Sequence, residues 1–197
     1  LKMLSEYNIR LNSVKGVLIT HDHSDHINEY TYNTFVNMNV PIYRHNILSA
    51  DSGIKVFQED SPFKVSSFSV CGFNVDHDCD CVGYSIITND GSKVTVATDF
   101  GSFSEDIDDY FINSNLIIIE SNHDVKMLEA TNRPSSLKKR IRESHLSNEK
   151  SAESICRVLK KSTKLPTAIL LAHISDEANT RDNAVGCLRK YLKGNIR

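Results

Sequence analysis

The sequence predicts an α/β protein, an α+β sandwich in which layers of sheet are covered by helices. Two observations predict this. Short apolar or alternating runs typical of strands come in series, and amphipathic helical stretches lie between and after them. No internal repeat or low-complexity linker divides the chain, whose 197 residues suit one compact domain and whose 40% hydrophobic content can form a core. We therefore expect one domain over residues 1–197.

In the first half, a short amphipathic stretch at residues 4–11 precedes a buried strand at residues 14–20. Residues 28–38 are expected to form a helix, because Ile27, Tyr30, Phe35 and Met38 fall on one side. The apolar and alternating patterns that follow predict short strands at residues 41–43, 56–57, 63–70 and 73–75.

In the second half, residues 84–87 and 94–97 flank Asn89-Asp90-Gly91, a hairpin turn signal. The run at residues 116–119 predicts a fully buried strand, and residues 137–143, after Pro134, predict a helix. Residues 148–161 predict a helix capped by Ser147 or Asn148. The last elements expected are a strand at residues 168–172 and a helix at residues 179–192.

Four polar residues each follow a hydrophobic strand immediately: His21, Asp99, Glu120 and His173. Strand ends at one edge of a sheet are rigid places from which side chains can be aimed at one point. One such coincidence means little, whereas four indicate a shared site.

The first of these residues opens the segment His21-Asp22-His23-Ser24-Asp25-His26, which reads H-x-H-x-D-H. Imidazole and carboxylate are ligands that zinc and manganese accept. In an extended turn His21 and His23 point the same way, while Asp25 and His26 can reach a second point nearby. One loop would then supply ligands to two adjacent ions. The alternative, a polar surface loop that is rich in histidine, is disfavoured by the buried strand before it.

Later residues complete two metal positions. His77 is expected to join His21 and His23 in a three-histidine site with one position open for water; alone, it would be a loop histidine. The second ion would be held by Asp25, His26, Asp99 and His173, with Asp99 bridging both ions. Alone, Asp99 would be the start of a turn before Gly101.

Two divalent ions (Zn²⁺ or Mn²⁺) a few ångströms apart would hold a bridging hydroxide and neutralise an anionic substrate. This chemistry fits hydrolysis of a phosphodiester or another ester without a protein nucleophile. We expect Asp25 to belong to the catalytic centre as well as to the ligand set.

His145 is a candidate catalytic residue, because it precedes a predicted helix N-terminus, where backbone N–H groups favour a phosphate. It would donate a proton to the leaving oxygen; the alternative is a capping-loop histidine. Ser147 and Asn148 would cap the helix or contact phosphate oxygens. Glu120 and His123 would orient His145 or a metal-ligating histidine, although Glu120 can also simply mark the edge of the core.

Two further groups stay open. Lys138, Lys139, Arg140 and Arg142 would follow a nucleic-acid backbone or form a solvated helix face. The C-x-C spacing of Cys79 and Cys81 does not fit common zinc clusters, so ordinary free cysteines are favoured, and His45 is expected to be a surface histidine.

Composition limits the classes of function. The net charge of −2 excludes a global basic field, so binding to nucleic acid would need a local patch. No signal peptide and no apolar run long enough to span a membrane is present, which favours no membrane partner and a reducing cytoplasm with free thiols. The oligomeric state cannot be read from the sequence.

The order of these motifs resembles the metallo-β-lactamase superfamily, and within it the YycJ/WalJ-type nucleases. The segments that carry the resemblance are residues 20–27, His77-Asp78 with Val82-Gly83-Tyr84, residues 120–124, residues 145–148 and residues 171–175. It implies an αββα fold, a binuclear metal site and metal-dependent DNA exonuclease activity, with DNA favoured over RNA. Thioester and β-lactam hydrolases of the superfamily lack the His145-Leu146-Ser147 segment.

Members of the superfamily usually carry several strands ahead of the H-x-H-x-D-H loop, and those strands are absent here. We therefore expect an N-terminally truncated domain. Two alternatives to a nuclease follow: a small-molecule cyclic phosphodiesterase or other ester hydrolase of the same fold, and a truncated inactive domain. The presence of all seven candidate ligands argues against decay of the site.

Overall fold

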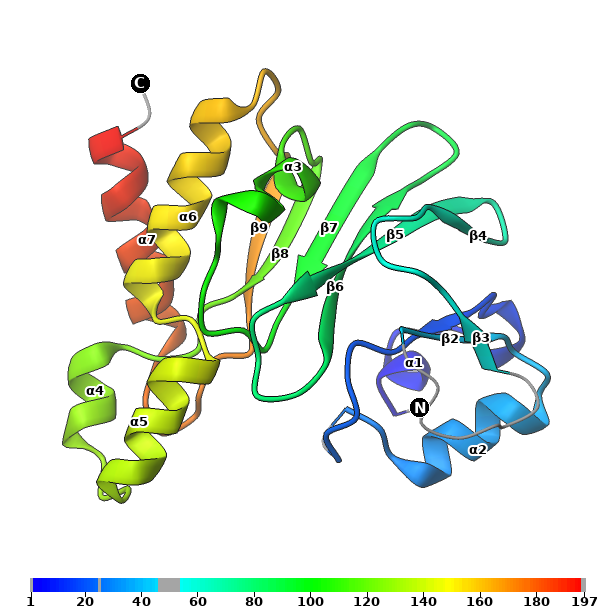
Figure 1. The fold of residues 1–197 in the computed structure, drawn as a ribbon, viewed down its shortest axis with the longest axis horizontal. Coiled ribbons are helices and arrows are strands. Elements are labelled where there is room, and N and C mark those ends of the chain that lie inside the picture. The colour runs from blue at the N-terminus through cyan, green and yellow to red at the C-terminus, as the bar shows by residue number, and fades with distance from the viewer. Residues whose placement is uncertain (1, 25, 46–53, 196–197) are drawn as a thin grey trace.

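The computed structural model describes residues 2–24, 26–45 and 54–195 (Figure 1). Its α-helices are α1 (Lys2–Glu6), α2 (Glu29–Asn37), α3 (Asp108–Phe111), α4 (Val125–Ala130), α5 (Ser135–Ser144), α6 (Asn148–Lys161) and α7 (Arg181–Asn195). Two 3₁₀ turns are η1 (Leu11–Ser13) and η2 (Glu105–Ile107). None of the helices in these ranges is long and apolar enough to cross a membrane.

The strands form two sheets. A small parallel sheet has the order β1 (Val17–Leu18), β2 (Ile42–Arg44), β3 (Ile54–Val56). A larger mixed sheet has the order β4 (Phe63–Val65), β5 (Phe68–Val75), β6 (Cys81–Ile87), β7 (Lys93–Ala97), β8 (Leu116–Glu120), β9 (Ala168–Ala172). Its first four strands are antiparallel neighbours, whereas β7, β8 and β9 run parallel.

Alternation along the strands of the large sheet buries both of its faces. Phe73, Ala97 and Ile119 pack under Ile155 of α6 in one hydrophobic cluster. On the opposite face, Val70, Val82 and Tyr84 pack against Tyr43 of β2. A third cluster joins Ile42 of β2 to Phe35 of α2. The layers are therefore helix, sheet, sheet and helix (Figure 1), which confirms the predicted fold class.

The predicted convergence of strand ends holds for the parallel strands of the large sheet. The register pairs Ala97 with Ile119 and Glu120 with Ala172, so the carboxyl ends of β7, β8 and β9 lie at one edge. His21 reaches this edge from the small sheet instead. The backbone N–H of Val82 donates to the carbonyl of Thr20 at 3.1 Å, which holds the histidine-rich loop against β6.

Several elements differ from the sequence-based expectation. Only Val17–Leu18 of residues 14–20 is a strand. The strand expected over residues 63–70 is broken, because Val65 pairs with Phe68 across a tight turn in which Ser66 has φ of 54°. Serine is not a turn residue that signals positive φ, so the hydrophobic pattern hid this hairpin. Helices α3 and α4 were also not predicted, although Asp124 caps α4 by accepting from the N–H of Met127 at 2.9 Å.

Candidate metal centre

His21 is buried at the edge of the large sheet where β7, β8 and β9 end. Its two ring nitrogens have different surroundings. Nδ1 lies 3.0 Å from Thr20 Oγ1 and 3.5 Å from Cys81 Sγ. Nε2 is buried without a hydrogen-bond partner among the described residues. Burial and, next, the neighbouring His26 lower the pKa of His21 to about 4, so its ring is neutral at pH 7. A neutral imidazole with one open nitrogen has the form of a metal ligand.

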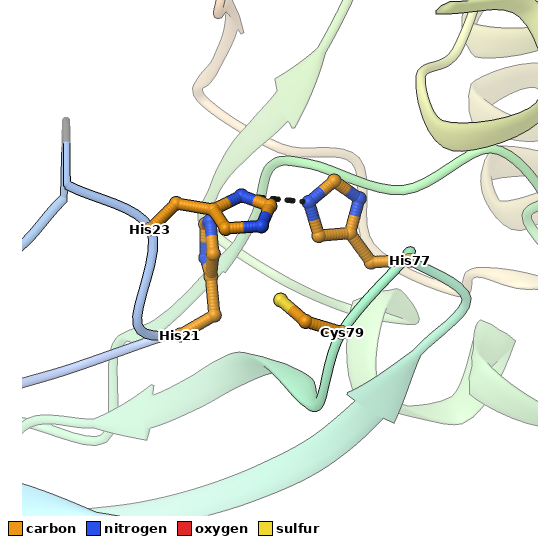
Figure 2. A group of neighbouring side chains, drawn as sticks. All are labelled: His21, His23, His77 and Cys79. Carbon is orange, nitrogen blue, oxygen red and sulfur yellow. Dashed lines mark hydrogen bonds between the residues drawn. The ribbon is translucent and has the colours of Figure 1, made fainter. Parts of the chain in front are cut away.

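His23 and His77 face His21 to form the predicted three-histidine cluster (Figure 2). Nδ1 of His23 lies 3.4 Å from Nε2 of His77. The Nδ1–H of His77 donates to the carbonyl of Ser144 at 3.2 Å, which fixes the tautomer and directs Nε2 toward the cluster. Burial lowers the pKa of His77 as well. The loop after β1 and the loop after β5 thus meet at one point.

Asp99 lies between His26 and His173, the two histidines that were predicted to bind the second ion together with it. Its Oδ2 is 3.4 Å from Nε2 of His26, and its Oδ1 is 3.2 Å from Nδ1 of His173. Its carboxylate is almost fully buried, and within the described ranges Oδ2 makes no hydrogen bond. Asp99 and His173 both have positive φ, 63° and 53°, which turns the chain sharply at the ends of β7 and β9. Asp25, the remaining predicted ligand and catalytic residue, lies outside the described residues.

Glu120, at the end of β8, is fully buried and holds two of the site's histidines. Its Oε1 accepts from Nδ1–H of His145 at 2.9 Å and of His173 at 2.6 Å. Its Oε2 accepts the backbone N–H groups of Phe100 and Leu146, each at 3.1 Å. Burial alone would raise the pKa of Glu120, but these hydrogen bonds outweigh it and lower the pKa to about 2. This geometry supports the predicted orienting role.

The other three residues expected near the site belong to its scaffold. Ser147 caps α6 by accepting from the N–H of Lys150 at 3.2 Å. Asn148 is buried, and its Oδ1 accepts from Ser121 and Asn179. His123 is buried beside Ser147, with its carbonyl accepting the N–H of Asn148. These three residues are not part of the lining of the cavity described below. The geometry therefore favours helix capping over phosphate contact for Ser147, and a buried amide network for Asn148.

Acid should destabilise the protein through His123. Burial lowers the pKa of His123 to about 4, from an ordinary value of 6.5. Between these values the unfolded state binds a proton that the folded state does not, so stability falls as the pH drops from 6.5 to 4. We expect His123→Gln to reduce this acid-dependent loss by up to about 3 kcal/mol. Urea unfolding of both proteins across that pH range measures it, and parallel curves would contradict the assignment.

A cavity of about 530 Å³ lies at the cluster, and its lining includes the predicted residues His23, His77, Asp99, His145 and His173. Arg133 and Arg140 stand on its wall, each paired with an acid: Arg133 Nε lies 2.7 Å from Glu177, and Arg140 Nε lies 2.8 Å from Asp78.

Only part of the predicted basic cluster on α5 lines the cavity. Of its four residues only Arg140 lines the cavity. Lys139 pairs with Glu143, Arg142 pairs with Glu129, and Lys138 donates to the carbonyl of Glu129. The sequence analysis did not single out Arg133, and it expected Cys79 to be an ordinary free cysteine. The sulfur of Cys79 lies among the three histidines (Figure 2), whereas His45 pairs with Glu59.

These side chains fit a pair of divalent ions. One donor atom from each of His21, His23 and His77 lies within 4.8 Å of the others, and the same holds for His21, His26 and Asp99. A third group joins Asp99, Glu120, His145 and His173. The buried Nε2 of His21 and Oδ2 of Asp99, which lack hydrogen bonds among the described residues, are satisfied if a cation binds between them. The donor set, imidazole with carboxylate, is that of borderline divalent metals.

Comparison with known proteins identifies the family of the chain. The model of the β-lactamase superfamily domain matches residues 4–169. The chain is 30% identical over 202 residues to exodeoxyribonuclease YycJ of Bacillus anthracis, covering 92% of this chain and 72% of that protein. It is also 30% identical to exodeoxyribonuclease WalJ of Streptococcus pneumoniae over 195 residues, or 92% and 71% of the two chains.

Solved structures agree in fold. The metallo-β-lactamase fold protein YhfI from Bacillus subtilis superposes with a TM-score of 0.69 at 20% identity, over 98% of this chain and 77% of that one. The short form of human tRNase Z superposes with a TM-score of 0.60 at 15% identity, over 89% and 78%.

Proposed function

The chain belongs to the metallo-β-lactamase superfamily and, within it, to the YycJ/WalJ family, and from that membership we propose that it is a metal-dependent DNA exonuclease. Its class, a metal-dependent hydrolase, follows from the family itself. The finer proposal rests on one observation: residues of the histidine cluster, Asp99 and His145 line the same cavity, in a chain similar to two exodeoxyribonucleases.

His21, His23 and His77 would hold one divalent ion. His26, Asp99 and His173, together with Asp25, would hold another. When bound, two such ions activate water at neutral pH and stabilise negative charge on a phosphodiester. The carboxylate of Asp99 would be shared between the two ions, since it is grouped both with His21 of the first position and with His173 of the second. The buried Glu120 keeps His173 in one tautomer and orientation.

Arg133 and Arg140 would receive the phosphates that flank the scissile bond. Both guanidinium groups line the cavity, and both already bind a carboxylate, so each is held in place before substrate arrives. An arginine fork matches phosphate oxygens in geometry and charge. The other basic side chains of α5, Lys138, Lys139 and Arg142, do not line the cavity, so these two arginines are the principal substrate contacts in this proposal.

His145 would protonate the leaving oxygen. Its Nδ1 is occupied by Glu120 and its ring lines the cavity, so Nε2 is the nitrogen available to substrate. We expect His145→Gln to retain both ions while turnover falls about 10²–10⁴-fold, the usual contribution of a positioned general acid. Single-turnover rates with parallel metal analysis measure this. Unchanged turnover would show that His145 serves the fold alone.

The exonuclease proposal is tested with the full chain loaded with Mn²⁺ or Zn²⁺ and offered linear and circular DNA of the same sequence. We expect mononucleotides to be released from the linear DNA only, with binding that weakens steeply as salt rises. Cleavage of circular DNA, or of RNA alone, would overturn the proposal. Hydrolysis of a small chromogenic phosphodiester without attack on linear DNA would indicate a small-molecule phosphodiesterase instead.

A further inference from the structure

Cys79 brings a sulfur atom to the three-histidine cluster. One donor atom from each of His21, His23, His77 and Cys79 lies within 4.8 Å of all the others. Figure 2 shows the Cys79 side chain rising from its loop so that the sulfur points toward the three rings. Four nitrogen and sulfur donors around one point are the arrangement that a tetrahedral zinc ion takes.

The backbone explains how Cys79 reaches this position. Val75 at the end of β5 pairs with Cys81 at the start of β6, so residues 76–80 form the short connection between two neighbouring strands. An isolated bridge between Asp76 and Ser102 and the hydrogen bond from His77 to Ser144 hold that connection. His77 and Cys79, two residues apart, therefore reach the cluster from one anchored loop.

The neighbouring Cys81 occupies a different place. Its sulfur is buried in the core, 3.5 Å from Nδ1 of His21, the nitrogen that Thr20 also contacts. The open nitrogen of His21 is Nε2, so Cys81 lies on the side of the ring that faces away from a bound ion. Only one of the two thiols in the C-x-C pair is grouped with the three histidines among the described residues.

Asp78 is the competing donor. Its Oδ1 lies 3.2 Å from Nε2 of His77 and 3.5 Å from Nε2 of His23, but its Oδ2 accepts from Arg140 at 2.8 Å. The arginine draws this carboxylate toward the cavity wall, and Asp78 is not grouped with His21. A test must therefore distinguish sulfur from carboxylate at the ion.

We propose that Cys79 is the fourth protein ligand of the first metal position, which makes it a three-histidine, one-cysteine site. This inference rests on the metal centre proposed above. A thiolate is a soft ligand that zinc accepts well and manganese poorly, so the first position would select zinc over manganese. Binding releases the thiol proton to solvent.

Cobalt(II) provides the test, because a thiolate bound to cobalt gives an intense charge-transfer band in the near ultraviolet that imidazole and carboxylate ligands do not. The full chain, Cys79→Ser and two cysteine controls, Cys71→Ser and Cys81→Ala, are loaded with cobalt. We expect the band in the parent and both controls. We expect Cys79→Ser to retain cobalt without the band and to bind zinc roughly tenfold or more weakly, with manganese binding unchanged.

The outcomes separate this inference from the proposed function. Cobalt bound by the parent chain without a thiolate band, or a band that survives in Cys79→Ser, would overturn the role of Cys79 and leave the histidine and carboxylate centre intact. Failure of the parent chain to bind cobalt or zinc at the cluster would overturn both. Loss of cobalt from Cys79→Ser together with a folded circular dichroism spectrum would support the ligand role, provided that Cys71→Ser retains it.

Discussion

Replacing Asp99 by asparagine is expected to abolish hydrolysis while the fold persists. Asparagine has the size of aspartate and tolerates the φ of 63° at this position, whereas alanine would be strained there. The amide is neutral and offers one oxygen acceptor, so it cannot be shared between two ions as the carboxylate would be. We expect metal content to fall from two ions per chain to one or fewer, and activity to fall by more than about a hundredfold.

The matched control is Asp60→Asn. Asp60 also has positive φ, 54°, but it is exposed, pairs with Tyr110 and belongs neither to the cavity lining nor to the candidate metal groups. Elemental analysis and DNA hydrolysis are measured on both variants beside the parent chain. Two ions per chain and full activity in Asp99→Asn would remove the shared carboxylate from the mechanism, and with it the binuclear interpretation.

The sheet edge that carries the candidate metal centre could be predicted because its information is local. Glu120 and His173 each follow an apolar strand, Asp99 follows the β-branched run Val94-Thr95-Val96, and parallel strands must bring their carboxyl ends to one edge. Local sequence patterns do not show which sheet a strand joins. His21 follows β1, which belongs to the small sheet, so its approach to the site depends on the packing of two sheets, a contact between residues far apart in the chain.

The roles of side chains around that edge were less predictable for the same reason. Ser147 and Asn148 lie beside His145 in sequence, yet the start of α6 turns them inward, into a helix cap and a buried amide network. Arg133 carries no signal of its own, and the C-x-C spacing favoured an ordinary free thiol at Cys79. The places of both side chains depend on where α5 and the loop between β5 and β6 pack. The same holds for Arg142, which is basic in sequence but binds Glu129 in the fold and does not line the cavity.

Glu120→Gln is expected to impair both stability and metal binding. The carboxylate accepts two backbone N–H groups on one oxygen and two imidazole N–H groups on the other. A glutamine can keep its oxygen on one side only. If the oxygen faces the backbone, the amide N–H₂ meets Nδ1 of His145 and His173, which must give up their protons. Their Nε2 atoms then carry hydrogen, and His173 can no longer ligate through that nitrogen.

The stability cost follows from the depressed pKa of Glu120, about 2 against an ordinary 4.5. A carboxylate whose pKa is lowered by folding stabilises the fold above pH 4.5, and this stabilisation is lost as the pH falls toward 2. At pH 7 the variant should therefore lose about 3 kcal/mol of unfolding free energy.

Glu143→Gln, on an exposed glutamate of α5 that pairs with Lys139, is the control, with an expected loss below about 1 kcal/mol. Urea unfolding gives the stability of each variant, and zinc titration gives the affinity, which should fall roughly 10–100-fold for Glu120→Gln. A folded Glu120→Gln protein with parental zinc affinity and turnover would mean that His145 and His173 do not need this carboxylate. Glu120, at the end of β8, would then stabilise the fold without contributing to metal binding or catalysis.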